Sequence, residues 1–184
     1  MATAPENYYV VIIAGGVGTR LWPKSRKKLP KQFFHLDGSK SLVRLSYERL
    51  EGFLPPQRVF ITAPATYKDL IAQEVPQIPE DNYILEPQKK GTTAANAISA
   101  MIIKQLDPQA VIHFVVADDY LTDFPRYHQM SLSAFKAASQ GGVVVFGVKP
   151  RYPNPGLGHV KISQKLSQEE GVEIYQAEGF VEKP

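Results

Sequence analysis

Residues 8–32, YYVVIIAGGVGTRLWPKSRKKLPKQ, decide the fold of this chain. Residues 8–14 form a continuous run of apolar, largely β-branched residues, which is typical of a strand buried on both faces of a parallel sheet. The run ends in a glycine-rich segment, residues 15–20, where residues without a Cβ allow positive φ and a close approach to a ligand. Amides at the carboxyl end of a parallel strand form an anion-binding concavity, and the planar guanidinium of Arg20 suits two phosphate oxygens. We therefore expect a polyphosphate ligand.

Two standard nucleotide-binding motifs do not fit this segment. Leu21 occupies the place of the last glycine in the dinucleotide motif G-x-G-x-x-G, and the chain has no G-x-x-x-x-G-K-[ST] phosphate loop. A glycine cluster after a strand is also compatible with a simple tight turn. Support for a phosphate-binding loop must therefore come from the residues around the segment.

That support comes from the longer pattern G-G-x-G-T-R-L-x-P, which is followed by Lys31 in a Pro-Lys pair. The pattern resembles the signature loop of the sugar-phosphate nucleotidylyltransferases. Trp22-Pro23, Ser25-Arg26 and the segment PKQF at residues 30–33 resemble the mannose-1-phosphate guanylyltransferase branch in particular. The resemblance implies transfer of GMP from GTP to mannose 1-phosphate, giving GDP-mannose and pyrophosphate, with Mg²⁺ as cofactor and Arg20, Lys31 and Asp118 as catalytic residues.

The composition is that of an ordinary globular protein. A chain of 184 residues with a net charge of +3 gives no reason to expect nucleic acid or a membrane as a partner. Cysteine is absent, no apolar run reaches membrane-spanning length, and the N-terminus lacks a signal-peptide pattern, so we expect a cytoplasmic protein. Basic residues gather near the glycine segment, either for phosphate binding or as a solvated basic face: Arg20, Lys24, Arg26, Lys27, Lys28 and Lys31.

Strand-like and helix-like patterns alternate along the chain up to residue 148. This alternation predicts an α/β fold, a Rossmann-like three-layer sandwich with a mostly parallel central sheet and ligands at the carboxyl ends of the strands. The expected strands after the first are residues 58–63, 82–85, 110–116 and 143–148. The expected helices are residues 41–50, with Ser41 as N-cap, and then 67–75, 92–106 and 124–139, with Asp123 as a cap.

From residue 150 the pattern changes to a Pro- and Gly-rich tail. Residues 159–163 and 172–180 are expected to form two strands joined by a polar loop, as a hairpin-like insertion. The resemblance implies one nucleotidylyltransferase catalytic domain over residues 1–184, incomplete at its C-terminal end. We therefore expect these 184 residues alone to turn over mannose 1-phosphate only slowly.

A second chemical site is expected at Ala117-Asp118-Asp119, directly after a buried strand. Paired carboxylates there can hold Mg²⁺ together with water and phosphate oxygens, although an acidic pair can also cap the next element. In a βαβ sheet this segment and the glycine segment open onto the same edge. The guanylyltransferases carry A-D-H here with the Asp on the metal, so Asp118 matches the metal ligand and Asp119 replaces the His.

Residues 86–92, EPQKKGT, lie between a strand end and a helix start, where exposed amides and a glycine can accept a purine edge. The resemblance implies that this segment frames the nucleobase, and an ordinary βα loop is the alternative. Guanylyltransferases usually have E-P-x-x-R-N-T, so Lys90 stands for the Arg and Gly91 for the Asn. The nucleotide-binding residues that we expect are Ala14, Gly15, Gly16, Gly18, Thr19, Arg20, Glu86, Gly91 and Thr92.

The sugar phosphate is expected near the end of the chain, where the family has G-Y-G-Y and F-x-E-K-P segments. Gly158, Glu182 and Lys183 match these segments and are the expected sugar-phosphate ligands. Leu157 and His159 replace the two tyrosines. Without the resemblance, Glu182 and Lys183 would be a surface ion pair.

Several other functions remain open. The nearest is a nucleotidylyltransferase that makes an ADP-, UDP- or dTDP-sugar, and the next is a non-catalytic regulatory protein that binds a sugar nucleotide. A third is a nicotinamide-dependent oxidoreductase with Asp37 on the ribose, which the missing third glycine argues against. GTP and mannose 1-phosphate are the expected partners, and assembly into a homo-oligomer is left open.

Overall fold

A computed structural model describes residues 3–16, 18, 22, 25–26, 30–35 and 38–183. The chain divides into two compact units, Met1–Pro125 and Arg126–Pro184. None of the described helices has both the length and the apolar character needed to cross a membrane.

The strands are β1 (Tyr8–Ile13), β2 (Val59–Pro64), β3 (Tyr83–Glu86), β4 (Val111–Val116), β5 (His159–Glu169) and β6 (Val172–Val181). The α-helices are α1 (Leu42–Glu48), α2 (Lys68–Glu74), α3 (Thr92–Leu106) and α4 (Phe124–Ser139), and the short 3-10 helices are η2 (Lys31–Phe33), η3 (Pro56–Arg58), η4 (Ala65–Tyr67) and η5 (Glu80–Asn82).

The first unit is built on a parallel sheet with the strand order β3-β2-β1-β4. Val10 of β1 lies beside Val59 of β2 on one side and His113 of β4 on the other. The chain therefore adds β2 and β3 on one side of β1 and then crosses to the other side for β4. The predicted α/β fold with a parallel central sheet is confirmed.

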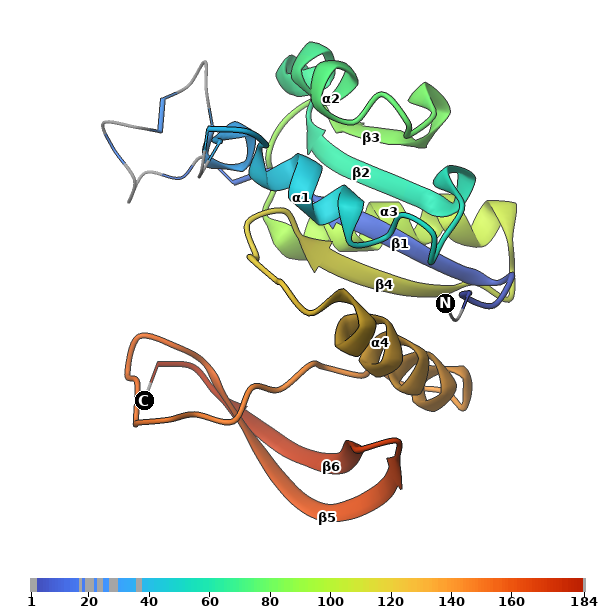
Figure 1. The fold of residues 1–184 in the computed structure, drawn as a ribbon, viewed down its shortest axis with the longest axis vertical. Helices are drawn as coiled ribbons and strands as arrows, with labels where there is room; N and C mark the ends of the chain where they lie inside the picture. Colours follow the sequence, from blue (N-terminus) through green and yellow to red (C-terminus); the bar gives the residue numbers. More distant parts are fainter. Residues whose placement is uncertain are drawn as a thin grey trace. The chain divides into compact units, whose positions relative to one another are not determined.

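Both faces of this sheet are covered by helices, with α1 and α3 on opposite faces (Figure 1). Val11, Phe60 and Ile84 form a buried cluster with Ile103 of α3. Because side chains alternate along a strand, Val10 and Ile12 face the other side, and both are fully buried. This double burial explains why residues 8–14 form a continuous apolar run.

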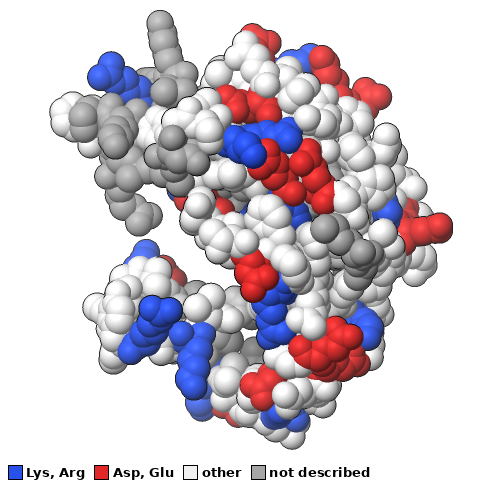
Figure 2. All heavy atoms as spheres, viewed as in Figure 1, with Lys and Arg blue, Asp and Glu red and all other residues white. Residues whose placement is uncertain are grey.

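Helix α1 begins as its sequence predicts, and its outer face is highly charged. The Ser41 hydroxyl accepts a hydrogen bond from the Arg44 amide at 3.2 Å, which confirms the N-cap. Arg44 pairs with Glu48 and Glu51, each at 2.9 Å. Figure 2 shows basic and acidic side chains interleaved over this helix. These pairs are only partly exposed, and surface ion pairs each contribute about 0.2–1 kcal/mol to stability.

The second unit combines α4, from Arg126 onward, with the antiparallel hairpin β5–β6. The two turn residues, Glu170 and Gly171, both have positive φ, which matches the twist of a two-residue hairpin turn. The Arg126 guanidinium donates to the carbonyl of Gly171 at 2.7 Å and to that of Glu170 at 3.2 Å. These bonds hold the turn against the helix.

Two sequence predictions fail in this second unit. Residues 143–148 belong to neither sheet, and Val143 and Val148 are 93% and 92% exposed. A β-branched run favours a strand only where a partner strand pairs with it, and this segment has none among the described residues. The polar loop expected between the hairpin strands is also wrong, because β5 runs to Glu169, where it pairs with Val172.

His113, in β4, makes the stability of the first unit depend on pH. Its Nδ1 lies 2.7 Å from the Tyr8 hydroxyl. Burial, and then the charge of Arg49, lower the pKa of His113 from 6.5 to about 4. The unfolded chain therefore binds a proton more readily than the folded chain between these values. The contribution of neutral His113 is complete above pH 6.5 and is lost as the pH falls toward 4.

We expect about 2–3 kcal/mol of the free energy of unfolding to be lost from this source between about pH 7 and pH 4.5. His113→Asn keeps an acceptor for Tyr8 but cannot titrate, so its unfolding free energy should fall less over the same range. Chemical denaturation at both pH values measures the difference, and His159→Asn in the second unit is the control. Equal pH dependence in the parent and His113→Asn would contradict the assignment.

Candidate functional site

The candidate site lies at the carboxyl ends of β1 and β4, where the strand order of the sheet reverses direction. The sheet ladder continues just past both strands, with the Ala14 amide donating to Thr62 at 2.8 Å and the Ala117 amide donating to Ile13 at 3.0 Å. The glycine segment follows Ala14, and Asp118 follows Ala117. The point where strand order reverses is the usual ligand position in an open α/β sheet.

Lys31 joins these two segments. Its Nζ donates a hydrogen bond to Oδ2 of Asp118, which lies 87 residues away in the sequence. The same side chain lies against the glycine segment. A Cβ on Gly16 would stand 3.0 Å from Cε of Lys31, and one on Gly18 would stand 2.7 Å from Cβ of Lys31. Gly18 also has a φ of +69°, so both its conformation and its surroundings require glycine.

Two further polar side chains lie at the start of the glycine segment. Glu86, at the end of β3, is buried, and a Cβ on Gly15 would stand 3.5 Å from its Oε2. Gln32 is also buried, and its Nε2 donates to the carbonyl of Ala14. Gln32 thereby ties the segment that carries Lys31 to the end of β1.

The charges at this edge are accessible to a ligand. The side chains of Lys31 and Asp118 are 26% and 37% exposed. Loss of hydration raises the pKa of the Asp119 carboxyl; the Asp118 carboxylate acts in the same direction, whereas Arg49 and Lys31 oppose the rise. Two carboxyl groups and one ammonium therefore share one electrostatic environment.

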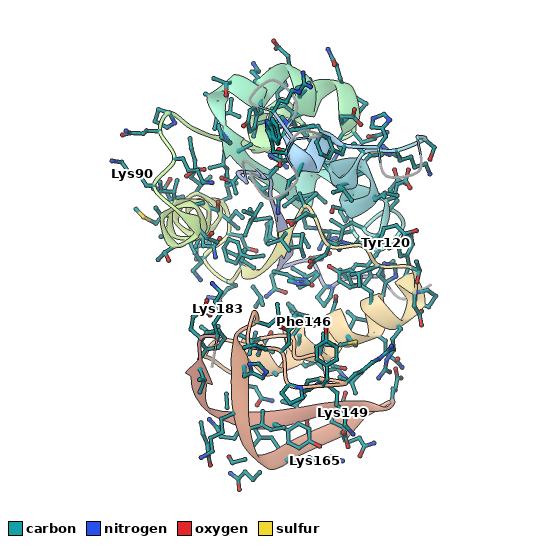
Figure 3. The ribbon with its side chains drawn as sticks, turned by 90° about the vertical axis from the view of Figure 1, so that its left-hand side faces the viewer. Lys90, Tyr120, Phe146, Lys149, Lys165 and Lys183 are labelled. Atoms are coloured by element: carbon teal, nitrogen blue, oxygen red, sulfur yellow. The ribbon has the colours of Figure 1, made fainter. Side chains whose placement is uncertain are left out.

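The expected base-binding segment leads into α3. Gly91 is the N-cap of α3 with a φ of +94°, and a Cβ there would meet nothing within 4 Å. The helix begins at Thr92, which is exposed, and the Ala95 amide donates to the Gly91 carbonyl at 3.2 Å. Lys90 lies in the loop just before it (Figure 3). The open space at Gly91 leaves the first amides of α3 accessible.

The three expected sugar-phosphate residues lie together in the second unit. A Cβ on Gly158 would stand 2.2 Å from Cζ of Phe180 and 3.0 Å from Oε2 of Glu182. Lys183 pairs with Glu182 at 3.0 Å and has a φ of 45°, in the left-handed region. The hairpin end therefore presents one carboxylate and one ammonium beside a glycine that has no room for a side chain.

The structure thus brings together two groups of expected residues, each within its own unit. In the first unit, contacts join Lys31 to Asp118, Gly16 and Gly18, and Gly15 to Glu86. Thr19 and Arg20, and also Asp37, lie outside the described residues. Sequence reasoning missed Gln32 and Arg49 as parts of this site. Gln32 could have been found as the polar residue next to Lys31, and Arg49 as a cation on the buried side of a helix.

The carboxylates at this edge of the sheet show whether the site could hold Mg²⁺. Within the described ranges, no group of three or more His, Cys, Asp or Glu residues could hold a metal ion. Asp118 offers an accessible hard oxygen ligand that already binds the Lys31 ammonium. Mg²⁺ in phosphate-transfer sites usually binds one or two carboxylates, with waters and substrate phosphates completing its shell. The donors therefore fit an ion that arrives with a polyphosphate.

Comparison with known proteins gives a consistent result. The family model described as "Nucleotidyl transferase" matches residues 9–184. Mannose-1-phosphate guanylyltransferase of Escherichia coli is 33% identical over 178 residues, covering 95% of this chain and 38% of that protein. The chain thus spans well under half the length of this curated relative.

Two solved structures share the fold. One, titled mannose-1-phosphate geranyltransferase and coming from Thermus thermophilus, has a TM-score of 0.81 and 31% identity, and the match covers 97% of this chain and 50% of that one. The other, titled mannose-6-phosphate isomerase from Helicobacter pylori, has a TM-score of 0.74 at 22% identity, covers 97% of this chain and 61% of that one, and supports the fold alone.

Proposed function

Because this chain belongs to the nucleotidyl transferase family, we propose that it transfers GMP from GTP to mannose 1-phosphate, giving GDP-mannose and pyrophosphate. The observation that carries the proposal is the meeting of Lys31, the glycine segment and Asp118 where the strand order reverses. The name of the Escherichia coli relative supports the choice of guanosine and mannose.

The proposed reaction needs no nucleophile from the protein. A phosphate oxygen of mannose 1-phosphate attacks the α-phosphorus of GTP and forms the new P–O bond. The bond between the α-phosphorus and the bridging oxygen breaks, and pyrophosphate leaves with its electron pair. The contribution of the protein is to position the reactants in line and to stabilise developing negative charge.

The residues of the first unit take these roles. The amides of Gly15, Gly16 and Gly18 orient the phosphates of GTP, and Arg20 binds the outer phosphates. Lys31 neutralises charge at the α-phosphate and the leaving oxygen, because its ammonium lies against the glycine segment. Glu86, with Gly91 and Thr92, frames the guanine.

The acceptor and the metal complete the proposal. Gly158, Glu182 and Lys183 bind the sugar phosphate, with the carboxylate on sugar hydroxyls and the ammonium on the phosphate. Asp118 would hold Mg²⁺, which would neutralise phosphate charge as a Lewis acid. Lys31, which donates to Asp118 in this structure, would then contact phosphate oxygens.

The test combines binding with turnover. Isothermal titration with the Mg²⁺ complexes of GTP, ATP, UTP and dTTP gives the order of affinity, and pyrophosphate release is measured with each nucleotide and mannose 1-phosphate. We expect GTP to bind most tightly and pyrophosphate release to require mannose 1-phosphate. Glucose 1-phosphate is the matched control for the acceptor.

The other outcomes identify the competing functions. Tighter binding of ATP, UTP or dTTP would replace guanosine with another base. Binding of GDP-mannose, with no pyrophosphate release from any nucleotide, would favour a regulatory protein. Failure to bind any of the four nucleotides would refute nucleotidyl transfer by this chain.

A further inference from the structure

Arg49 is a buried cation that the proposed reaction does not use. It follows directly after α1, as the C-cap of that helix. Only 2% of the residue is exposed, and it is the largest of the fully buried side chains described. A buried charge loses its favourable hydration, so an apolar side chain would fill the same space with a smaller penalty. This burial suggests a role beyond packing.

The guanidinium reaches the end of β4. Its Nη2 donates a hydrogen bond to the carbonyl of Val116, the last residue of that strand, at 3.3 Å. The next residue, Ala117, donates its amide to Ile13 of β1. Because successive residues of a strand direct their backbone groups to opposite sides, the Val116 carbonyl points away from β1. Arg49 therefore binds the strand on the side that β1 does not hold.

This bond lies two residues before Asp118. Ala117, held by β1, and Val116, held by Arg49, together fix the direction in which the chain leaves the strand. The guanidinium lies close to the acidic segment through its bond to Val116, and its burial keeps it from contacting a ligand directly.

We propose that Arg49 is a positioning residue for the phosphate and metal site, holding the end of β4 so that Asp118 faces Lys31 and a Mg²⁺-bound nucleotide. The inference rests on the proposed function for its ligand. Its structural part, the restraint of residues 116–119, can be measured without any ligand. Loss of the restraint lets the Asp118 carboxylate adopt orientations that do not bind the ion.

The test uses Arg49→Met, which removes the donor and keeps most of the volume, and Arg49→Lys, which keeps the charge and one donor. Arg44→Met is the matched control, because Arg44 lies on the same helix and its ion pairs with Glu48 and Glu51 do not involve β4. Three quantities are measured for each variant: amide hydrogen exchange at residues 117–119, the affinity for GTP with and without Mg²⁺, and the melting temperature.

For Arg49→Met we expect exchange at residues 117–119 to rise about tenfold and the Mg²⁺-dependent gain in GTP affinity to fall about tenfold, since a hydrogen bond from a charged donor is lost. Metal-free GTP affinity should stay within about twofold, because the glycine segment and Lys31 remain. Arg49→Lys should restore both quantities to within about threefold of the parent. Arg44→Met should lower only the melting temperature.

The outcomes separate this inference from the proposed function. Unchanged exchange at residues 117–119 in Arg49→Met would overturn the positioning role. Equal losses of GTP affinity with and without Mg²⁺, in step with the melting temperature, would also overturn it and leave Arg49 a purely structural residue. If the parent binds no nucleotide while Arg49→Met, but not Arg44→Met, shows faster exchange at residues 117–119, the proposed function fails and the restraint of β4 stands. If Arg49→Met does not fold, the parent decides: exchange of the amides of residues 118 and 119 as fast as in an unfolded chain would show that the segment is not restrained and would refute the inference.

Discussion

Lys31→Ala is expected to lower the rate of pyrophosphate release by about 10²–10³-fold, because it removes one preorganised charge from the reacting phosphates. Its effect on folding should be small. The ion pair with Asp118 is partly exposed, and such pairs contribute about 1 kcal/mol or less. Steady-state kinetics with GTP and mannose 1-phosphate measure the first effect, and chemical denaturation measures the second.

Two comparisons make this prediction specific. Lys40→Ala removes another lysine from an ion pair, with Glu48 at 2.9 Å, and should leave the rate unchanged. Lys31→Arg should restore little activity, because the larger planar guanidinium places its charge differently from the compact ammonium that lies against Gly16. A rate for Lys31→Ala within about threefold of the parent would remove Lys31 from the proposed mechanism.

Asp118→Asn is expected to lower the same rate by about 10²–10³-fold, and to do so through the metal. The amide has nearly the same shape but no charge, so the gain in GTP affinity on adding Mg²⁺ should disappear. Metal-free GTP should bind about threefold more tightly, since a negative charge near the triphosphate is removed and Lys31 is released. These opposite changes distinguish a lost metal ligand from a damaged site.

Asp119→Asn is the matched control, one residue further along and outside the pattern that the resemblance assigns to the metal. We expect a loss of rate below about tenfold for it, because its carboxyl group is not paired with Lys31. Titration of GTP into each variant, with and without Mg²⁺, gives the comparison. The assignment of Asp118 is wrong if the variant keeps the full Mg²⁺ effect, or if Asp119→Asn loses it instead.

Local patterns predicted most elements of the first unit. The run at residues 8–14 predicted β1, Ser41 predicted the start of α1, and the pattern at residues 92–106 predicted α3 with the same bounds as in the structure. In each case the signal lies within a few residues of the feature. Burial on both faces produces an apolar run, and an N-cap needs only a hydroxyl near the next amides.

The failures occur where a segment depends on a distant partner. Residues 143–148 have the composition of a core strand but do not pair, whereas polar residues before Glu169 extend β5 because β6 lies beside them. Composition contains no information about which strand will be a neighbour. The same reason explains why the length of β5 was underestimated.

The candidate site likewise has features that the sequence predicted and features that it did not. The βαβ pattern predicted that the glycine segment and Asp118 share one edge of the sheet, and the contact of Asp118 with Lys31 confirms that they do. The burial of Gln32 and Arg49 was not predicted, because a polar residue beside a charged segment is usually exposed. Both residues bind backbone carbonyls at the ends of strands. Every residue has such a carbonyl, so the sequence does not indicate which one will be the partner.

The sequence by itself determined the central strand, the glycine segment that follows it, the Ser41 cap of α1 and the α/β alternation, because each depends on short-range sterics and on the spacing of buried residues. The tertiary structure decided the strand order β3-β2-β1-β4, the contact of Lys31 with Asp118 across 87 residues, and the hydrogen bond of Arg49 to the end of β4. These features depend on which distant segments pack together, and the free energy of that packing belongs to the whole fold rather than to any one segment.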